Sequence, residues 1–191
     1  MQVEIAEEPA SFLTEYARIP ISFEVDRFFE VATAEKPGEF ILTERAVGAP
    51  SVKDYDAVQE NGPIFLQGRF DISNWGVFSA RLAGQIVAGA IVAFQSAEME
   101  MLDGRDDLAL LWDIRVAPEA RRKGIGAALL GAVEKWALAR GAARIDVETQ
   151  NINVPACRFY ERHGFVLRAV NEGAYRDFPE EIQLLWYKDL R

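Results

Sequence analysis

The segment 108–140 constrains the fold more than any other part of the chain. An apolar run over residues 108–116 is followed by a basic turn with two glycines, residues 121–126, and then by a predicted helix that ends at Gly141. Apolar side chains at helical spacing define the inner face of that helix: Ile125, Leu129, Val133 and Trp136 or Ala137. Because the start of a helix presents free backbone N–H groups, this succession predicts a site for a phosphorylated cofactor.

The remaining elements predict an α/β (α+β) fold with a mixed, mostly antiparallel central sheet and flanking helices. Alternating or continuous apolar runs predict strands at residues 19–31, 39–47, 75–82, 86–95, 143–149, 165–169 and 182–188. A second helix is expected from Asn153, which can cap it, to about His163, with Gly164 closing it.

Three segments have weaker patterns. Residues 1–18 have no clear period and are expected to form a frayed arm or a short helix. Residues 48–63 contain glycine and proline around polar side chains and are expected to form a surface loop. Residues 96–107 are rich in carboxylates and are expected to be a mobile acidic connection.

Length and composition limit the possible classes of protein. The 191 residues predict one domain, residues 1–191. The longest apolar run, residues 86–94, is far shorter than the ~20 residues that span a bilayer, so no membrane segment is expected. A single cysteine and a single histidine argue against a disulfide and against a metal cluster, and a cytoplasmic protein is the default expectation.

The net charge of −9 limits the classes of binding partner. It repels phosphate backbones, which argues against nucleic-acid binding, and it attracts a cationic small molecule or a basic peptide. Solubility alone remains an alternative explanation of the acidic excess.

The turn 121–126 contrasts with this acidic background. Glycines at 124 and 126 let a ligand's phosphates approach the backbone, and three neighbouring basic side chains supply positive charge. The turn lacks the pattern of a Walker A loop, and Leu129 stands where a dinucleotide fingerprint needs its third glycine. Nucleotide hydrolysis and hydride transfer are therefore disfavoured, while a purely structural turn remains open.

Two motifs lie about thirty residues apart in the second half of the chain. They are Arg121-x-x-Gly124-x-Gly126, after a strand that ends Val116-x-Pro118, and Asn153-x-x-Ala156-x-x-Phe159-Tyr160-x-x-x-Gly164-Phe165. In this order they resemble the GNAT superfamily of acetyl-CoA-dependent N-acetyltransferases, and residues 148–157 with Lys53-Asp54-Tyr55 most resemble streptothricin acetyltransferases. The resemblance implies a GNAT-like acyl-CoA N-acyltransferase fold with a cofactor-binding core at about 108–170.

The resemblance also implies site residues. Backbone amides from Arg122 through Ala127 would hold the pyrophosphate of acetyl-CoA, the strand edge at Ile114 to Val116 would pair with the pantetheine arm, and Asn153 would hydrogen-bond that arm. Tyr160 would protonate the departing CoA thiolate; a core aromatic residue is the alternative. The cofactor-binding residues implied are Ile114, Arg115, Val116, Arg121, Arg122, Lys123, Gly124, Ile125, Gly126, Ala127, Asn153 and Tyr160.

The chemistry requires one further group. An alkyl amine with a pKa near ~10.4 is mostly protonated at neutral pH, so a carboxylate must remove a proton before the amine attacks. Asp113 and Glu148, near the ends of predicted strands, are the candidate bases. Each could instead be a solvated strand residue or a partner of Arg115 or Arg144.

These features predict transfer of acetyl from acetyl-CoA to a primary amine of a cationic small molecule, by direct attack in a ternary complex. A streptothricin-like antibiotic is the first candidate acceptor, and antibiotic resistance the corresponding role. A protein or peptide N-acetyltransferase and a non-catalytic acyl-CoA-binding module are the alternatives. Residues 48–74 and 171–181 are expected to build the acceptor pocket, and the final strands could pair two chains as a homodimer.

Overall fold

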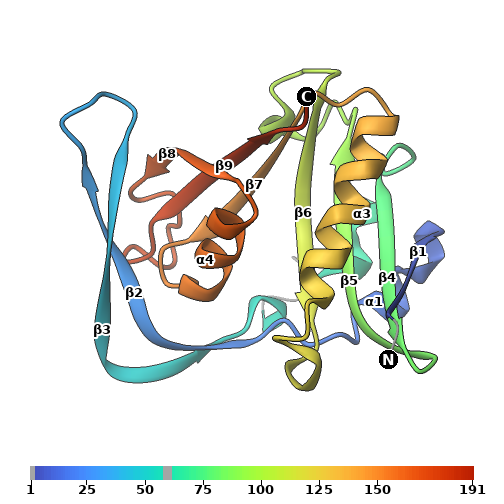
Figure 1. Ribbon diagram of the computed structural model, residues 1–191, viewed down its shortest axis with the longest axis horizontal. Helices are drawn as coiled ribbons and strands as arrows, with labels where there is room; N and C mark the ends of the chain where they lie inside the picture. The colour runs from blue at the N-terminus through green and yellow to red at the C-terminus, as the bar shows by residue number, and fades with distance from the viewer. Residues whose placement is uncertain (1–2, 58–61) are drawn as a thin grey trace. The chain divides into compact units, whose positions relative to one another are not determined.

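The computed structural model describes residues 3–57 and 62–191. The chain forms two compact units: unit 1 contains Met1–Ile21, Asp54–Ile145 and Asp189–Arg191, and unit 2 contains Ser22–Lys53 and Asp146–Lys188. The strands, labelled in Figure 1, are β1 (Val3–Glu8), β2 (Phe23–Thr33), β3 (Phe40–Lys53), β4 (Gly76–Leu82), β5 (Gln85–Phe94), β6 (Leu108–Val116), β7 (Arg144–Gln150), β8 (Val166–Asn171) and β9 (Gln183–Asp189). The α-helices are α1 (Leu13–Tyr16), α2 (Leu66–Arg69), α3 (Ile125–Ala139) and α4 (Val154–Arg162), and short 3₁₀ turns lie at Ala10–Phe12, Tyr55–Ala57, Pro63–Phe65, Glu100–Leu102 and Pro118–Ala120.

In unit 1, four strands are adjacent in the order β1, β4, β5, β6, and each pairs antiparallel with its neighbour. β4 and β5, which correspond to the strands predicted at residues 75–82 and 86–95, form an antiparallel hairpin. Its two central turn residues, Ala83 and Gly84, both have positive φ angles, 52° and 79°. Such angles give a turn the twist that joins two neighbouring antiparallel strands directly.

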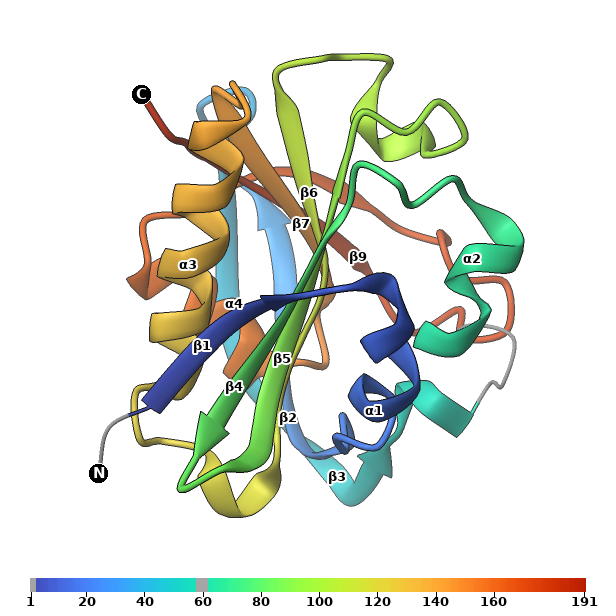
Figure 2. The ribbon, with the colours of Figure 1, turned by 90° about the vertical axis from the view of Figure 1, so that its right-hand side faces the viewer.

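Helix α3 covers one side of these strands, and α1 and α2 lie on the other side (Figure 2). The predicted inner face of α3 is confirmed, because Ile125, Leu129, Val133, Trp136 and Ala137 are all buried. The Trp136 ring meets the rings of Phe78 and Phe94 edge-on, with centroids 6.1 and 6.2 Å apart.

β6 contains a β-bulge that determines which way its polar side chains point. Val92 of β5 pairs with Leu111, but Ile91 pairs with Asp113, so Trp112 is the extra residue. Because side chains alternate along a strand, this insertion places Asp113 on the face opposite to Leu111. Arg115, paired with Gly89, lies on the same face as Asp113.

In unit 2, β2 and β3 form a long antiparallel hairpin (Figure 1) whose turn covers the predicted Lys36-Pro37-Gly38. A second group of strands has the order β7, β9, β8. Asn151 joins the two groups, because its backbone carbonyl accepts from the Phe29 N–H at 2.9 Å and its side-chain amide donates to the Phe29 carbonyl at 3.0 Å.

Helix α4 begins as predicted. The Asn153 side chain accepts from the Ala156 N–H at 3.2 Å, and Pro155 occupies the first turn, where a missing N–H is tolerated. Gly164, with φ of 84°, follows the end of the helix, as a residue in the left-handed region commonly does.

The three weakly patterned segments differ in part from their predictions. Residues 3–8 form strand β1 instead of a frayed arm, whereas the short helix given as the alternative is present as α1, and Phe12, Leu13 and Tyr16 are buried. Residues 48–53 continue β3, although the register shifts around this point, which is where Gly48 and Pro50 are accommodated. The predicted loop is thereby shortened, and its residues 58–61 lie outside the described part of the chain.

The predicted acidic connection 96–107 contains more regular structure and more buried side chains than expected. It contains the 3₁₀ turn Glu100–Leu102, and the side chains of Met99 and Leu102 are buried. Across the described ranges 3–57 and 62–191, no helix is both long enough and apolar enough to cross a membrane.

Candidate active site

The basic turn between β6 and α3 has the geometry of an anion site. Gly124 is the N-cap residue of α3, with a φ of 79°. Because glycine has no side chain, the helix start has no side-chain cap. Ala128 has the first backbone N–H that donates within the helix, to the Gly124 carbonyl at 3.0 Å. The amides of Ile125, Gly126 and Ala127 precede it and have no intrahelical acceptor. A phosphate oxygen is a suitable partner for these amides, because the helix dipole is positive here.

Two of the three basic side chains help to shape this turn. Arg121 Nε donates to the Val116 carbonyl at 2.9 Å, and Lys123 Nζ donates to the Glu119 carbonyl at 2.7 Å. Burial lowers the pKa of the Arg121 guanidinium somewhat. Arg122 is exposed and has a φ of 64°, so its backbone takes the left-handed conformation that tightens the turn.

Arg115 is the centre of a buried polar cluster in unit 1. Its Nε and Nη2 donate to Asp113 Oδ2, its Nη1 and Nη2 donate to the Asp56 carboxylate, and Nη1 also donates to the Ile19 carbonyl. These bonds use every N–H that a guanidinium offers. The cation also lies over the Tyr16 ring, 5.0 Å from its centroid. Arg115 therefore anchors β6 to two segments that are distant in the sequence.

Asp113 is an ion-pair partner in this structure, which is one of the alternatives the sequence left open. Its side chain is 9% exposed. Burial raises the pKa of the Asp113 carboxyl, while Arg115 opposes that rise. Within residues 3–57 and 62–191, Asp113 Oδ1 and Tyr16 Oη are buried without a hydrogen-bond partner. Burial also raises the pKa of the Tyr16 phenol, so this hydroxyl keeps its proton at neutral pH.

An open hollow of about 550 Å³ lies elsewhere in unit 1. Its wall includes Phe70 and Trp75, whose rings are stacked with centroids 5.5 Å apart, and the carboxylates of Glu8 and Asp71. Trp112, the bulged residue of β6, contacts both aromatic rings. This placement accounts for the half-buried state of Trp112.

Glu148, the second candidate base, lies on β7 in unit 2 and is held by neutral donors. Tyr175 Oη donates to its Oε1 at 2.6 Å, and Gln183 Nε2 donates to its Oε2 at 2.8 Å. Gln150 Nε2 in turn donates to Tyr175 Oη at 2.9 Å. Unlike Asp113, Glu148 forms no ion pair among the described residues.

Helix α4 carries the remaining predicted residues. Tyr160 is 4% exposed, and its ring contacts Phe159 and Phe165 at centroid distances of 5.4 and 5.3 Å. Cys157 is buried next to Thr149, and burial raises the pKa of its thiol to about 11. His163 is half-buried, with Nδ1 2.7 Å from the Phe159 carbonyl oxygen.

The predicted site residues thus fall into two groups, one in each unit. Unit 1 holds residues 113–116 and 121–127, and unit 2 holds Glu148, Asn153 and Tyr160. The sequence did not indicate the parts played by Tyr16, Tyr175 and Gln183, because none lies in a recognised motif. In the described ranges, no group of three His, Cys, Asp or Glu side chains is placed to hold a metal ion.

Known proteins provide sequence comparisons. The chain matches the model of the Acetyltransferase (GNAT) family over residues 49–165. It is 43% identical to streptothricin acetyltransferase A of Bacillus subtilis over 81 residues, which are 41% of this chain and 47% of that protein. It is 36% identical to a streptothricin acetyltransferase of Escherichia coli over 93 residues, 47% of this chain and 53% of that protein. The chain spans about half the length of the curated relatives it matches.

Solved structures provide comparisons of the fold. The crystal structure of nourseothricin acetyltransferase aligns with a TM-score of 0.77 at 24% identity and covers 100% of both chains. A Bacillus anthracis protein assigned as a streptothricin acetyltransferase, solved in complex with acetyl coenzyme A, aligns with a TM-score of 0.79 at 24% identity, over 98% of this chain and 99% of that one. These alignments confirm the predicted mixed α/β fold. Since the family match extends over residues 49–165, more than half of the sequence, the chain belongs to the acetyltransferase (GNAT) family.

Proposed function

We propose that the protein transfers acetyl from acetyl-CoA to a primary amine of a cationic small molecule, with a streptothricin-type antibiotic as the first candidate. Family membership supports the reaction class. The names of the matched relatives support the acceptor, and the acetyl coenzyme A bound to the Bacillus anthracis protein supports the acyl donor. The observation that carries the proposal is the N-terminus of α3, which follows a basic turn and has no side-chain cap, in a chain with a net charge of −9.

Within unit 1, the backbone amides of residues 122–127 would bind the pyrophosphate, with Arg122 and Lys123 adding positive charge nearby. The backbone of Ile114 to Val116 would pair with the pantetheine arm in the manner of an added strand. Asn153 would hydrogen-bond the pantetheine arm through its side-chain amide, whose oxygen also accepts from the Ala156 N–H.

Glu148 is the better supported of the two candidate bases. Asp113 Oδ2 already accepts from Arg115, so protonating Asp113 would weaken a buried ion pair. Glu148 would instead take the proton of the incoming ammonium, directly or through water. As the amine nitrogen forms its bond to the acetyl carbon, the carbon–sulfur bond breaks. Tyr160 would give its proton to the departing thiolate, and the second proton that the nitrogen loses on becoming an amide would restore the phenol through solvent, while Glu148 would release its proton to solvent.

We also propose that the two units act as one catalytic domain, residues 1–191. Unit 1 is assembled from three separate stretches of the chain and unit 2 from two, so neither is one continuous segment. Limited proteolysis tests this proposal. If the two units form one domain, an early cut should leave no soluble, folded fragment that corresponds to either unit.

The reaction can be tested with purified protein and acetyl-CoA. CoA thiol release should occur with streptothricin and be absent or slower with aminoglycosides, polyamines and amino acids. Saturating acetyl-CoA should also raise the melting temperature, because a ligand at 100 times its Kd stabilises by about 2.7 kcal/mol. Acetylation of peptides in preference to every small amine would favour a protein N-acetyltransferase. Stabilisation by acetyl-CoA with no transfer to any acceptor would favour a binding module.

A further inference from the structure

Tyr175 lies across the polar face of β7. Glu148 and Gln150 are two residues apart on this strand, so their side chains point to the same face. Tyr175 Oη accepts from Gln150 and donates to Glu148. A phenol has one proton to donate, and the hydrogen bond from Gln150 directs that proton toward the carboxylate. The hydroxyl therefore donates to the Glu148 carboxylate and fixes its orientation.

The Glu148 carboxylate accepts two hydrogen bonds but has no cationic partner among the described residues. Both donors to its carboxylate, Tyr175 and Gln183, are uncharged. Hydrogen bonds to the charged form favour it without adding a cation. In the described part of the chain, Asp113, Asp56 and Glu181 all have a basic partner within ion-pair distance, and Glu148 has none. A half-buried carboxylate with this environment is suited to bind an ammonium group from outside the protein.

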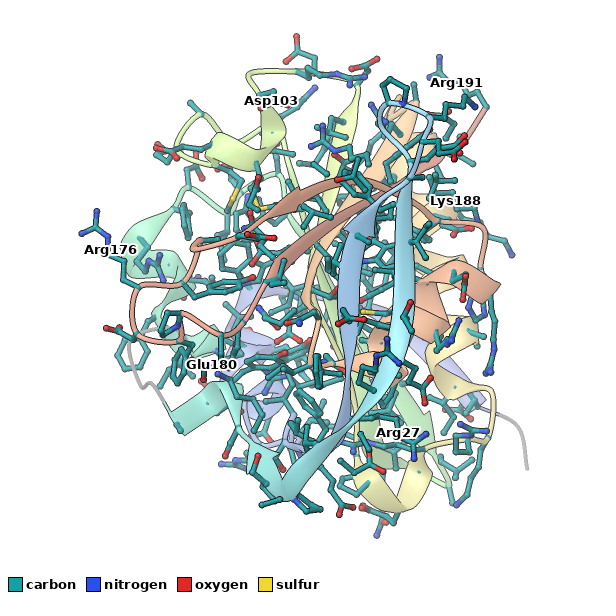
Figure 3. All side chains as sticks on the ribbon, turned by 90° about the vertical axis from the view of Figure 1, so that its left-hand side faces the viewer. Arg27, Asp103, Arg176, Glu180, Lys188 and Arg191 are labelled. Carbon is teal, nitrogen blue, oxygen red and sulfur yellow. The ribbon has the colours of Figure 1, made fainter. Side chains whose placement is uncertain are left out.

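The connection between β8 and β9, which carries Tyr175, is fastened to the end of β3. Lys53 Nζ donates to Glu181 Oε1, and the two side chains are only 17% and 6% exposed. The same nitrogen lies 3.4 Å from the centroid of the Phe178 ring. Arg176, next to Tyr175, projects away from the strands (Figure 3). Tyr175 thus points to β7 from a segment that is anchored a few residues further along.

We propose that Tyr175 is a positioning residue of the acceptor site, which holds Glu148 as the carboxylate that receives the cationic amine. This inference rests on the proposed function and deepens it. It assigns the selection of a charged amine to Glu148 and the alignment of Glu148 to Tyr175. It also gives Lys53 and Glu181 a role, because they hold the segment from which Tyr175 reaches the strand.

The first test compares Tyr175→Phe with the control Tyr187→Phe. Each substitution removes one phenol oxygen, and Tyr187 lies on β9. Hydrogen bonds to charged groups have net values of about 1.5–3 kcal/mol, so Tyr175→Phe should lower kcat/KM for streptothricin about 10- to 100-fold. The KM for streptothricin should rise by a larger factor than kcat falls, because the carboxylate that receives the amine is no longer held in its orientation. Affinity for acetyl-CoA should not change. The kcat/KM of Tyr187→Phe for streptothricin should stay within about twofold of the value for the parent protein.

The second test uses Gln183→Met, which removes the other donor from a different strand. It should raise the KM for streptothricin in the same way, so the inference stays testable even if one variant fails to fold. Far-UV circular dichroism and acetyl-CoA affinity show whether each variant is folded.

The outcomes separate the two proposals. If the parent protein acetylates no amine, the proposed function fails and this inference fails with it. If the parent acetylates streptothricin while folded Tyr175→Phe and Gln183→Met keep both its kcat and its KM for streptothricin, only the inference is overturned. A higher KM in both variants, with an unchanged KM in the control, supports it.

Discussion

Replacing Gly89 by alanine should damage the core of unit 1 through a single methyl group. In Gly89→Ala the new Cβ would lie 2.5 Å from Cε2 of Tyr16 and 2.8 Å from the backbone oxygen of Phe78. Real Cβ atoms essentially never come this close to another heavy atom. The Tyr16 ring is fully buried and the Phe78 oxygen belongs to the paired strand, so neither can move away freely.

The expected loss follows from these contacts. Overpacking a buried site destabilises a protein by about 1–3 kcal/mol. The Tyr16 ring also lies against the Arg115 guanidinium, so moving the ring disturbs the buried ion-pair cluster as well. We therefore expect a value in the upper half of that range, about 2–3 kcal/mol.

Gly131→Ala is the matched control, because it adds the same methyl group where nothing lies within 4 Å of the new Cβ. Gly131 is inside α3, and alanine is favoured over glycine in a helix interior by about 0.5–1 kcal/mol. This variant should therefore be more stable than the parent protein. The two substitutions should have opposite signs and differ by about 3 kcal/mol.

Equilibrium unfolding in urea measures both variants. With a slope of about 1–3 kcal/mol per molar urea, the Gly89→Ala midpoint should fall by about 1 M or more. The reasoning is refuted if Gly89→Ala changes the free energy of unfolding by less than about 0.5 kcal/mol, the usual range for surface substitutions. It is equally refuted if Gly131→Ala is as destabilising as Gly89→Ala.

Three further predictions concern the basic turn and α4. Gly124→Val should weaken coenzyme A binding at least about tenfold in calorimetry, because a β-branched residue is strained at a φ of 79°; unchanged affinity would argue against the turn as the phosphate site. Cys157 should resist iodoacetamide at pH 8 in the folded protein and react fully in urea, because burial raises the pKa of its thiol to about 11; equal rates by mass spectrometry would contradict its burial. Asn153→Ala should lower the free energy of unfolding by about 1 kcal/mol through loss of the helix cap, and Asn153→Asp should retain most of it in the same urea titration.

The elements with a strong local signal could be predicted from the sequence. The inner face of α3 repeats at helical spacing, and α4 has Asn153 at its start and Gly164 after its end. The hairpin of β4 and β5 has a short glycine turn between two apolar runs. In each case the information lies within about fifteen residues, which is the range over which periodicity and caps operate.

The polar clusters could not be predicted, because they depend on contacts between distant residues. Asp56 and Ile19, which bind Arg115, are 59 and 96 positions away from it in the sequence. Tyr175 is 27 positions from Glu148, in a segment without a period. Charged residues could be proposed as candidates, but only the fold shows which carboxylate is already paired with a cation.

The bulge at Trp112 also determines how β6 tolerates change. If β6 kept Trp112 but paired with β5 without the bulge, Asp113 would oppose Ala90 in place of Ile91, and each later side chain of the strand would exchange sides. Asp113 and Arg115 would then face the apolar side chains beneath α3, and their charges would be buried without Asp56 or Ile19. Deleting Trp112 together with the bulge would instead leave Asp113 opposite Ile91 and keep the later side chains on their present faces. The pairing of β6 should therefore tolerate the loss of this one residue better than the loss of any single residue elsewhere in the strand, which would shift every later side chain to the other face.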